Sequence, residues 1–350
     1  MKILAILPNF NQIYFDWMYL YLPNGKKIKI SFSSFVKKQL GRFRIFVRLL
    51  RLEPRCLTFL SEDIFVISFL KKLWFISLCE GKIRQCESVR KGFSDVLMFC
   101  SMREYGYNIV YYGDYGQNVH EEEIHVYKLD ENLHSEICYT FPARSIKHIH
   151  NILYDKFHER FFIFTGDFGD HVGIYIADSK FCKVTPYLLG QQSYRAVIGK
   201  VLEKGLLYAT DAVMEDNYLF YISFLDNKPR KVLSLNGSVI YGLILNKGLL
   251  FSTTVEPRPS VTSRVISLID NRNGNGIKSN NVEVFFVSDE LVCRKLKTYR
   301  KDLLPMRLFQ YGSVSFPCLF DEQIDLQSIP INPVSVKYFD GMIDYLEIYG

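Results

Sequence analysis

A unit made of a strand, a short tip and a second strand recurs along the chain at a nearly constant spacing. Four such tips contain an acidic residue, and they read Tyr112-Gly113-Asp114, Thr165-Gly166-Asp167, Thr210-Asp211 and Thr253-Thr254-Val255-Glu256. Successive acidic residues lie 53, 44 and 45 positions apart. A repeat of about 40–50 residues with about four short strands is typical of a β-propeller blade.

The sequence between the tips has the same character. Segments such as Asp63–Phe69 and Lys72–Leu78 are rich in β-branched and aromatic residues, and turn signals separate them. Aromatic residues make up 15% of the 350 residues, enough to fill the space between stacked sheets. We therefore predict an all-β fold, a β-propeller of six or seven four-stranded blades over residues 57–350. A pair of β-sandwiches with coincident turns is the alternative.

Residues 1–56 differ from the rest in charge and in periodicity. Between Lys26 and Arg55 there are ten basic residues and one acid, whereas the net charge of the whole chain is only +6. Apolar residues spaced three and four positions apart in residues 34–52 predict a basic amphipathic helix. We expect a short N-terminal basic helical arm, which either packs on its own domain or makes peripheral contact with an anionic membrane.

The sequence also limits compartment and partners. The first apolar run stops at Pro8 without a cleavage site, and no stretch approaches the ~20 apolar residues that span a bilayer. The eight cysteines contain no C-x-x-C pair, so we expect reduced, mostly buried thiols. Aromatic residues are not interleaved with the basic run, which argues against a nucleic-acid partner. We expect a cytoplasmic protein, peripheral at the inner membrane if the helix binds there.

In a propeller, the tips of equivalent inner strands gather at one end of the central axis, where they can form one pocket. Paired carboxylates could serve as acid and base or nucleophile in glycosidic cleavage, and the candidates are Asp114, Asp167 and Asp211. Side chains that could bind hydroxyl groups or an anion are His148, His150, Gln192, Arg195 and Glu256. The alternative is that the aspartates only cap turns.

His148-Ile149-His150 is a separate motif, because residues i and i+2 of a strand point to the same face. Two such histidines with a nearby acid resemble part of a metal site, but no third ligand has a recognisable spacing. We therefore predict no metal and no cofactor and interpret the pair as the lining of a polar channel, while the sequence leaves open whether the pair binds a metal.

Four segments carry a family resemblance: His148-Ile149-His150-Asn151-Ile152-Leu153-Tyr154-Asp155, Thr165-Gly166-Asp167, Gly190-Gln191-Gln192-Ser193-Tyr194-Arg195-Ala196 and Thr210-Asp211. Together they resemble the sialidase-like β-propellers of the BNR/Asp-box superfamily, which are often encoded in bacterial capsule and exopolysaccharide gene clusters. The resemblance implies a propeller and a link to surface-polysaccharide production.

Three hypotheses for function follow. The first is a cytosolic propeller that binds a sugar or sugar-phosphate of surface-polysaccharide assembly, with Arg195 on the anionic group. The second is a glycoside hydrolase or lyase that uses Asp114, Asp167 or Asp211, with His150 assisting. The third is an interaction scaffold that docks polysaccharide-assembly proteins at the inner membrane surface. The sequence leaves open whether the protein is an enzyme.

Overall fold

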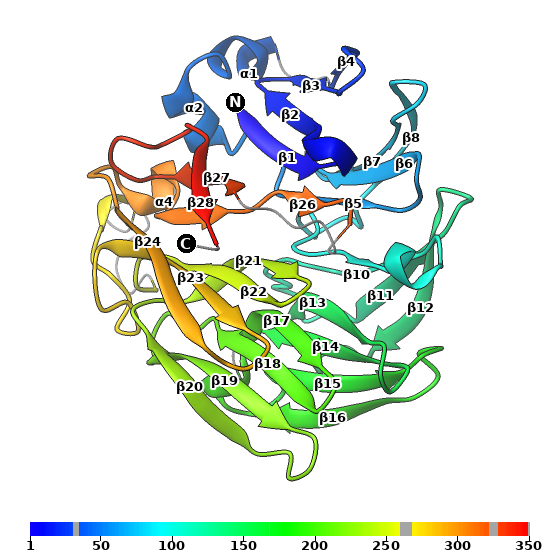
Figure 1. Cartoon of the computed structure of the whole chain (residues 1–350), viewed down its shortest axis with the longest axis vertical. Helices are drawn as coiled ribbons and strands as arrows, with labels where there is room; N and C mark the ends of the chain where they lie inside the picture. Colours follow the sequence, from blue (N-terminus) through cyan, green and yellow to red (C-terminus); the bar gives the residue numbers. More distant parts are fainter. Residues whose placement is uncertain (31–34, 168, 260–267, 322–327, 349–350) are drawn as a thin grey trace. The chain divides into compact units, whose positions relative to one another are not determined.

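The structure, a computed structural model, describes residues 1–30, 35–167, 169–259, 268–321 and 328–348 (Figure 1). Within these residues the chain runs through seven sheets in succession. The predicted all-β β-propeller is confirmed, and the described part of the chain contains seven blades.

Five of the sheets are four-stranded, and in each of them strands that are neighbours in sequence pair with each other. The strands are β5 (Cys56–Phe59), β6 (Ile64–Ser68), β7 (Lys72–Ser77), β8 (Lys82–Ser88); β9 (Cys100–Ser101), β10 (Val110–Gly113), β11 (Ile124–Leu129), β12 (Ser135–Phe141); β13 (His148–Asp155), β14 (Arg160–Gly166), β15 (Gly173–Asp178), β16 (Val184–Leu189); β17 (Ala196–Leu202), β18 (Gly205–Thr210), β19 (Asn217–Ser223), β20 (Pro229–Leu235); and β21 (Val239–Leu245), β22 (Gly248–Thr253), β23 (Asn281–Ser288), β24 (Cys293–Arg300). A meander of this kind needs only short turns, which the Asn-, Asp- and Gly-rich connections provide.

The first and the last sheet depart from this pattern. The first has the order β26-β1-β2-β3-β4, and β26, from near the C-terminus, lies parallel to β1. The last has three strands, in the order β25-β27-β28. The bounds of these strands are β1 (Lys2–Ile6), β2 (Gln12–Asp16), β3 (Tyr19–Tyr21), β4 (Lys27–Lys29), β25 (Ser313–Ser315), β26 (Cys318–Leu319), β27 (Ser328–Val334) and β28 (Asp344–Glu347).

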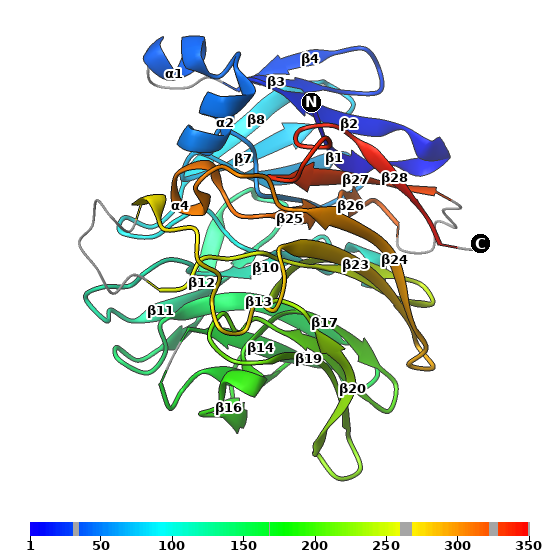
Figure 2. The same ribbon diagram turned by 90° about the vertical axis from the view of Figure 1, so that its left-hand side faces the viewer.

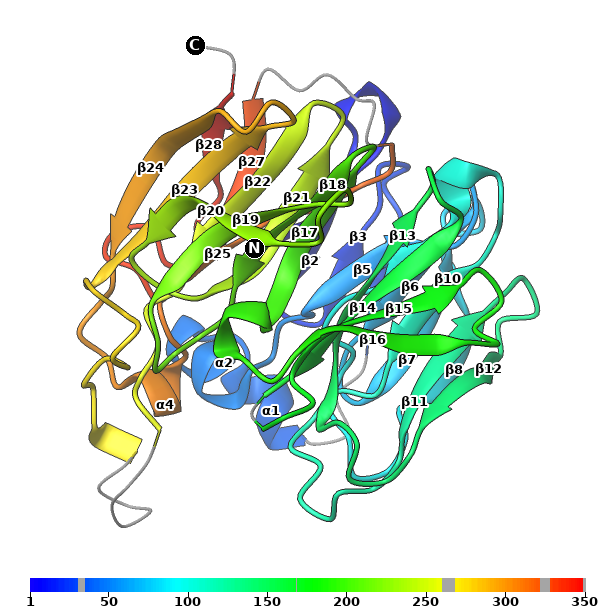
Figure 3. The same cartoon turned by 90° about the horizontal axis from the view of Figure 1, so that it is seen from below.

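The chain divides into two compact units. The first comprises Met1–Pro23, Lys29–Glu53 and Ile198–Gly350, and the second comprises Asn24–Ile28 and Pro54–Val197. The sheets β5–β8, β9–β12 and β13–β16 belong to the second unit (Figure 3). The division that we predicted at residue 56, between an arm and the propeller, stays a prediction.

Aromatic side chains fill the interior of the second unit. Tyr111 of β10 meets Phe161 of β14 edge-on, with ring centroids 4.9 Å apart, and Phe161 also packs on Phe181 at 4.8 Å. Phe141 of β12 contacts Tyr175 of β15 at 5.2 Å. These pairs join the sheet β9–β12 to the sheet β13–β16, so the aromatic excess of the sequence holds neighbouring blades together.

The first 30 residues contain strands where we expected only an arm. Strands β1 to β4 are each three to five residues long. Strands of three to five residues are too short for an alternating pattern to stand out from chance, which is why the sequence pattern did not reveal them.

The helix predicted over residues 34–52 is two short helices, α1 (Phe35–Leu40) and α2 (Arg44–Leu50) (Figure 2). Residue 34 lies outside the described residues. The break includes Gly41, a weak helix former, and Phe43, whose backbone is extended. Arg51 ends α2 in a left-handed conformation. Other helical segments within the described ranges include the helix α4 (Met306–Phe309) and the 3-10 turns η1 (Pro8–Phe10), η2 (Arg103–Tyr105) and η3 (Gln192–Tyr194).

All eight cysteines are free, but the expectation that they are mostly buried is wrong. Cys100 is buried, whereas Cys79, Cys86 and Cys182 are exposed. In the described part of the chain, no helix combines the length and the apolar character needed to cross a membrane.

We predict that Phe161→Ala lowers the free energy of unfolding by about 3–5 kcal/mol, because it empties a fully buried aromatic position. The control is Phe157→Ala, which removes a half-exposed ring from the turn after β13 and should cost within about 0.5 kcal/mol. Urea unfolding of both variants measures the difference, and equal costs would contradict the role of the aromatic interior.

Candidate functional site

Four polar side chains meet at one edge of the sheet β13–β16, all within the second unit. His148 and His150 lie at the start of β13, Asp167 follows the last residue of β14, and Arg195 lies between η3 and β17. Because His148 stands opposite Gly166 in the β13–β14 ladder, the register of this hairpin places Asp167 beside the histidine pair. We call His148, His150, Asp167 and Arg195 the His–Asp cluster.

Asp167 is the point on which the other three side chains converge. Its Oδ1 lies 3.3 Å from Nε2 of His148, 3.4 Å from Nε2 of His150 and 3.0 Å from Nη2 of Arg195. The two imidazole rings lie 4.9 Å apart between centroids. The rings and the guanidinium are buried, but the Asp167 side chain is 25% exposed. The cluster therefore reaches solvent through its carboxylate.

The hydrogen bonds of the two rings fix their tautomers. Nδ1 of His148 lies 2.6 Å from the main-chain oxygen of Gly116, and Nδ1 of His150 lies 2.9 Å from that of Ala196. A carbonyl oxygen only accepts, so each Nδ1 must carry the hydrogen. In a neutral ring this leaves a lone pair on Nε2, and both Nε2 atoms face Asp167.

Gly166 provides the space for the rings. A Cβ atom at this position would lie 2.2 Å from Nε2 of His150 and 2.9 Å from Nε2 of His148. The glycine of the Thr165-Gly166-Asp167 tip is therefore required by close packing against the two imidazoles.

Neighbouring groups hold the cluster in place. Gln192 donates from Nε2 to the main-chain oxygen of Asp167 at 2.9 Å. Tyr115 meets the His148 ring edge-on, with centroids 4.7 Å apart, and the Arg55 guanidinium lies 5.3 Å above the Tyr115 ring. These contacts fix both the backbone at Asp167 and the orientation of His148.

The charges of the cluster follow from its surroundings. Burial by itself would raise the pKa of Asp167, but the Arg195 guanidinium 3.0 Å from its carboxylate helps to hold that pKa well below its ordinary value. Burial lowers the pKa of His150 to about 4, against the opposing effect of Asp167. At neutral pH, Asp167 is therefore ionised and His150 is neutral.

Asp114 is also buried in the second unit, but it serves the fold. Its carboxylate forms an ion pair with Arg90 at 2.8 Å and accepts hydrogen bonds from the main-chain N–H of His125 and from the Tyr127 hydroxyl. Burial raises the pKa of Asp114, and these partners oppose the rise. The carboxylate is tied into the sheet β9–β12, which corresponds to the structural alternative considered for the tip acids.

Five of the eight predicted site residues lie together, namely His148, His150, Asp167, Gln192 and Arg195. Asp211 and Glu256 belong to the first unit instead. Asp211 is buried directly after β18, and Glu256 accepts a hydrogen bond of 2.6 Å from the Thr254 hydroxyl.

The sequence pattern missed the relation between Asp167 and the histidine pair. Asp167 is 17 residues beyond His150, which matches no ligand spacing. The predicted hairpin is the sequence feature that could have shown this relation. Two strands of similar length joined by a turn at Asp155 to Arg160 place the start of β13 beside the end of β14, and therefore the histidines beside Asp167.

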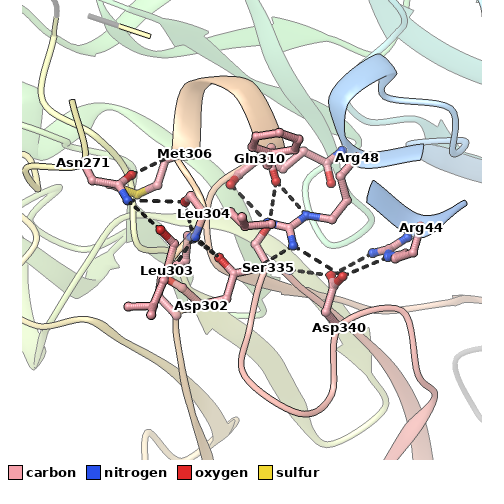
Figure 4. A network of polar contacts seen from close by, with 12 residues as sticks. Arg44, Arg48, Asn271, Asp302, Leu303, Leu304, Met306, Gln310, Ser335 and Asp340 are labelled. Atoms are coloured by element: carbon pink, nitrogen blue, oxygen red, sulfur yellow. Dashed lines mark hydrogen bonds and ion pairs between the residues drawn. The ribbon is translucent and has the colours of Figure 1, made fainter. Parts of the chain in front are cut away.

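A second polar network lies in the first unit, where α2 meets α4 and the stretch before β28 (Figure 4). Arg48 is only 3% exposed, donates to the main-chain oxygen of Phe309 at 2.7 Å and pairs with Asp302 at 2.5 Å. Arg44 pairs with Asp340 at 3.0 Å and with Glu53 at 2.7 Å. Two arginines of the basic helix predicted over residues 34–52 are therefore neutralised within the fold.

Large apolar side chains are exposed beside this network. Phe43 and Ile45 flank Arg44 in sequence, and Tyr338 and Met342 each lie two residues from Asp340. Leu303 follows Asp302. We call these five side chains the α2 surface. The ion pairs join the segments that carry these side chains.

Comparison with known proteins identifies the fold and no family. Neither a protein-family profile nor a curated protein matches the chain. A chain in the crystal structure of the mitotic checkpoint complex is similar, with a TM-score of 0.56 and 8% identity, over 100% of this chain and 91% of that chain. The Pan2 WD40 domain of Neurospora crassa gives a TM-score of 0.48 at 9% identity, over 85% and 80%. At such identities the likeness concerns the propeller fold alone, and the resemblance to sialidase-like capsule proteins stays a prediction.

We predict that Gly166→Ala destabilises the protein by about 1–3 kcal/mol, because the buried rings cannot give way to the added methyl group. If the added methyl group clashes with His150, the double variant Gly166→Ala/His150→Ala should lose less unfolding free energy than the sum of the losses in the two single variants. Urea unfolding of all three variants measures this coupling, and strict additivity would contradict the packing.

We predict that Arg48→Met lowers the free energy of unfolding by about 3 kcal/mol at neutral pH, because it removes a buried cationic partner from the partly buried carboxylates of Asp302 and Asp340. Burial tends to raise the pKa of Asp302, but Arg48 and Lys301 hold it below its ordinary value of 3.8. A depressed carboxylate pKa contributes stability above the unfolded value and loses it as the pH falls further.

The difference between wild type and Arg48→Met should therefore shrink as the pH falls from about 5 to about 2. Unfolding experiments across this range measure it. A difference that stays constant with pH would show that the loss comes from packing and not from the ion pairs.

Proposed function

We propose that this propeller is a protein-interaction module that binds its partner through the α2 surface. The observation that carries the proposal is that five exposed large apolar side chains stand on the segments that one ion-pair network joins. Tyr338 is 89% exposed and Phe43 is 61% exposed. Aromatic residues and methionine are enriched at protein interfaces, and clustered exposed apolar groups mark interaction sites.

The network beneath the α2 surface makes it a defined platform. Arg48 and Arg44 link α2 to Asp302 and Asp340, and Asp340 also accepts the main-chain N–H of Ser335 at 2.8 Å. Buried ion pairs add little net stability, but they fix geometry when every partner is in place. A partner therefore meets side chains that are already positioned, which lowers the entropy lost on binding.

The charge around the α2 surface specifies the chemistry of the partner. Residues 35–51 contain no acid, and the basic side chains outside the ion-pair network are Lys37, Lys38, Arg42 and Arg51. A complementary partner carries apolar side chains flanked by Asp or Glu. We therefore propose an acidic, apolar protein segment as the ligand. The similar fold within a mitotic checkpoint complex structure is consistent with a module that works in an assembly.

The other hypotheses from the sequence receive less support. Arg195, assigned to an anionic sugar group, already pairs with Asp167, and both histidine rings are buried. Of the three acids assigned to glycosidic cleavage, Asp114 pairs with Arg90 and Asp167 with Arg195, while Asp211 lies in the other unit. Sugar binding, polysaccharide assembly and hydrolysis stay predictions.

The proposal predicts that peptides selected on the full-length chain from a random display library share apolar residues flanked by acids. We expect Tyr338→Ser and Phe43→Ser each to weaken binding of such synthetic peptides about tenfold, as loss of an interface anchor does. Fluorescence polarisation measures the affinities. The control, Leu225→Ser, removes an equally exposed apolar side chain from the β19–β20 turn and should leave them unchanged.

Two results would overturn the proposal. One is binding of the selected peptides with the same affinity to the wild type, Tyr338→Ser and Phe43→Ser. The other is Phe43-dependent binding to phosphatidylserine vesicles without any peptide binding, which would favour the membrane alternative for residues 34–52.

A further inference from the structure

We propose that Nε2 of His148, Nε2 of His150 and the carboxylate of Asp167 bind a divalent metal ion of the zinc class. Of the residues that the structure describes, these three offer ligand atoms that all lie within 4.8 Å of one another. The proposal concerns the second unit and is independent of the α2 surface.

The spacing of the ligand atoms matches a tetrahedral ion. Zinc binds nitrogen and carboxylate oxygen at about 2.0–2.2 Å, so two ligands of a tetrahedral site lie about 3.3–3.6 Å apart. The distances from Asp167 Oδ1 to the two Nε2 atoms are 3.3 Å and 3.4 Å. These two distances are therefore those of a tetrahedral site, and the two Nε2 atoms lie within 4.8 Å of each other.

The hydrogen bonds of the rings are those of metal-bound histidines. A ligating imidazole usually donates its other N–H to a carbonyl or carboxylate group, which orients the ring. Here the carbonyl oxygens of Gly116 and Ala196 have that role. As a result, Nε2 of each ring faces Asp167 Oδ1, and Nε2 is the atom that a histidine held in this way offers to an ion.

An orphaned atom supports the same assignment. Nε2 of His148 is fully buried and has no hydrogen bond, although the carboxylate of Asp167 is nearby. A buried polar atom without a partner is costly, so this one calls for an explanation such as an ion.

The positive charge of Arg195 does not prevent binding. Its Nη2 lies 3.0 Å from Asp167 Oδ1, the same oxygen that faces the two imidazoles, but a carboxylate oxygen has two lone-pair positions. Asp167 can therefore accept from Arg195 and still ligate an ion. Two imidazoles and one carboxylate favour zinc, cobalt or iron over calcium and magnesium, which prefer oxygen ligands. The partial exposure of Asp167 leaves room for water as a fourth ligand.

The test uses the full-length chain without a histidine tag, stripped with EDTA, and the probes are Zn²⁺ and Co²⁺. We expect one equivalent per chain, a visible Co²⁺ spectrum of the four-coordinate type and a higher melting temperature with Zn²⁺. Asp167→Asn and His150→Asn should each weaken binding about 100-fold. His134→Asn, at an exposed histidine of the same unit, should leave binding unchanged.

Binding that is equally strong in Asp167→Asn and in the wild type would overturn the proposal, because it would come from exposed thiols such as Cys79, Cys86 and Cys182. The absence of binding to a folded wild-type chain would also overturn it. If His150→Asn does not fold, Asp167→Asn decides, since its side chain is partly exposed and nearly isosteric.

Discussion

The register between β13 and β14 determines the geometry of the His–Asp cluster. His148 pairs with Gly166, so the two imidazoles pack against a residue without a side chain. The same pairing places Asp167 next to the Nε2 atoms of both rings. A slip of one residue would turn every side chain of the strand to the other face. Packing of aromatic rings such as Tyr111 and Phe161 between the sheets prevents that slip. The site therefore depends on the hydrophobic interior of its own unit.

Much of the fold could be predicted because it repeats. The prediction of a propeller rests on the repeat and not on any single segment. The repeat appears in the acidic tip residues, which are 44 to 53 residues apart, in the turn signals and in the β-branched strands. The first 30 residues could not be predicted in the same way, since β3 and β4 have only three residues each. The helix of residues 34–52 kept its apolar spacing across Gly41, which is why the break was missed.

The candidate site was predicted only in part. Strand alternation correctly brought His148 and His150 together, but their third partner depends on pairing across a hairpin and has no spacing rule. The opposite error concerns Arg44 and Arg48. A helical pattern shows on which face of the helix a basic residue lies. It cannot show that Arg44 and Arg48 are neutralised by Asp340 and Asp302, which lie more than 250 residues away in sequence.

The central claim is that two imidazoles and a carboxylate hold an ion in this propeller. Crystals of the full-length chain grown with Zn²⁺ and measured at the zinc absorption edge test it most directly. The account predicts an anomalous peak about 2.0–2.2 Å from Nε2 of His148, Nε2 of His150 and a carboxylate oxygen of Asp167. Ordered rings that donate their Nε2–H directly to Asp167, with no peak between them, would contradict it.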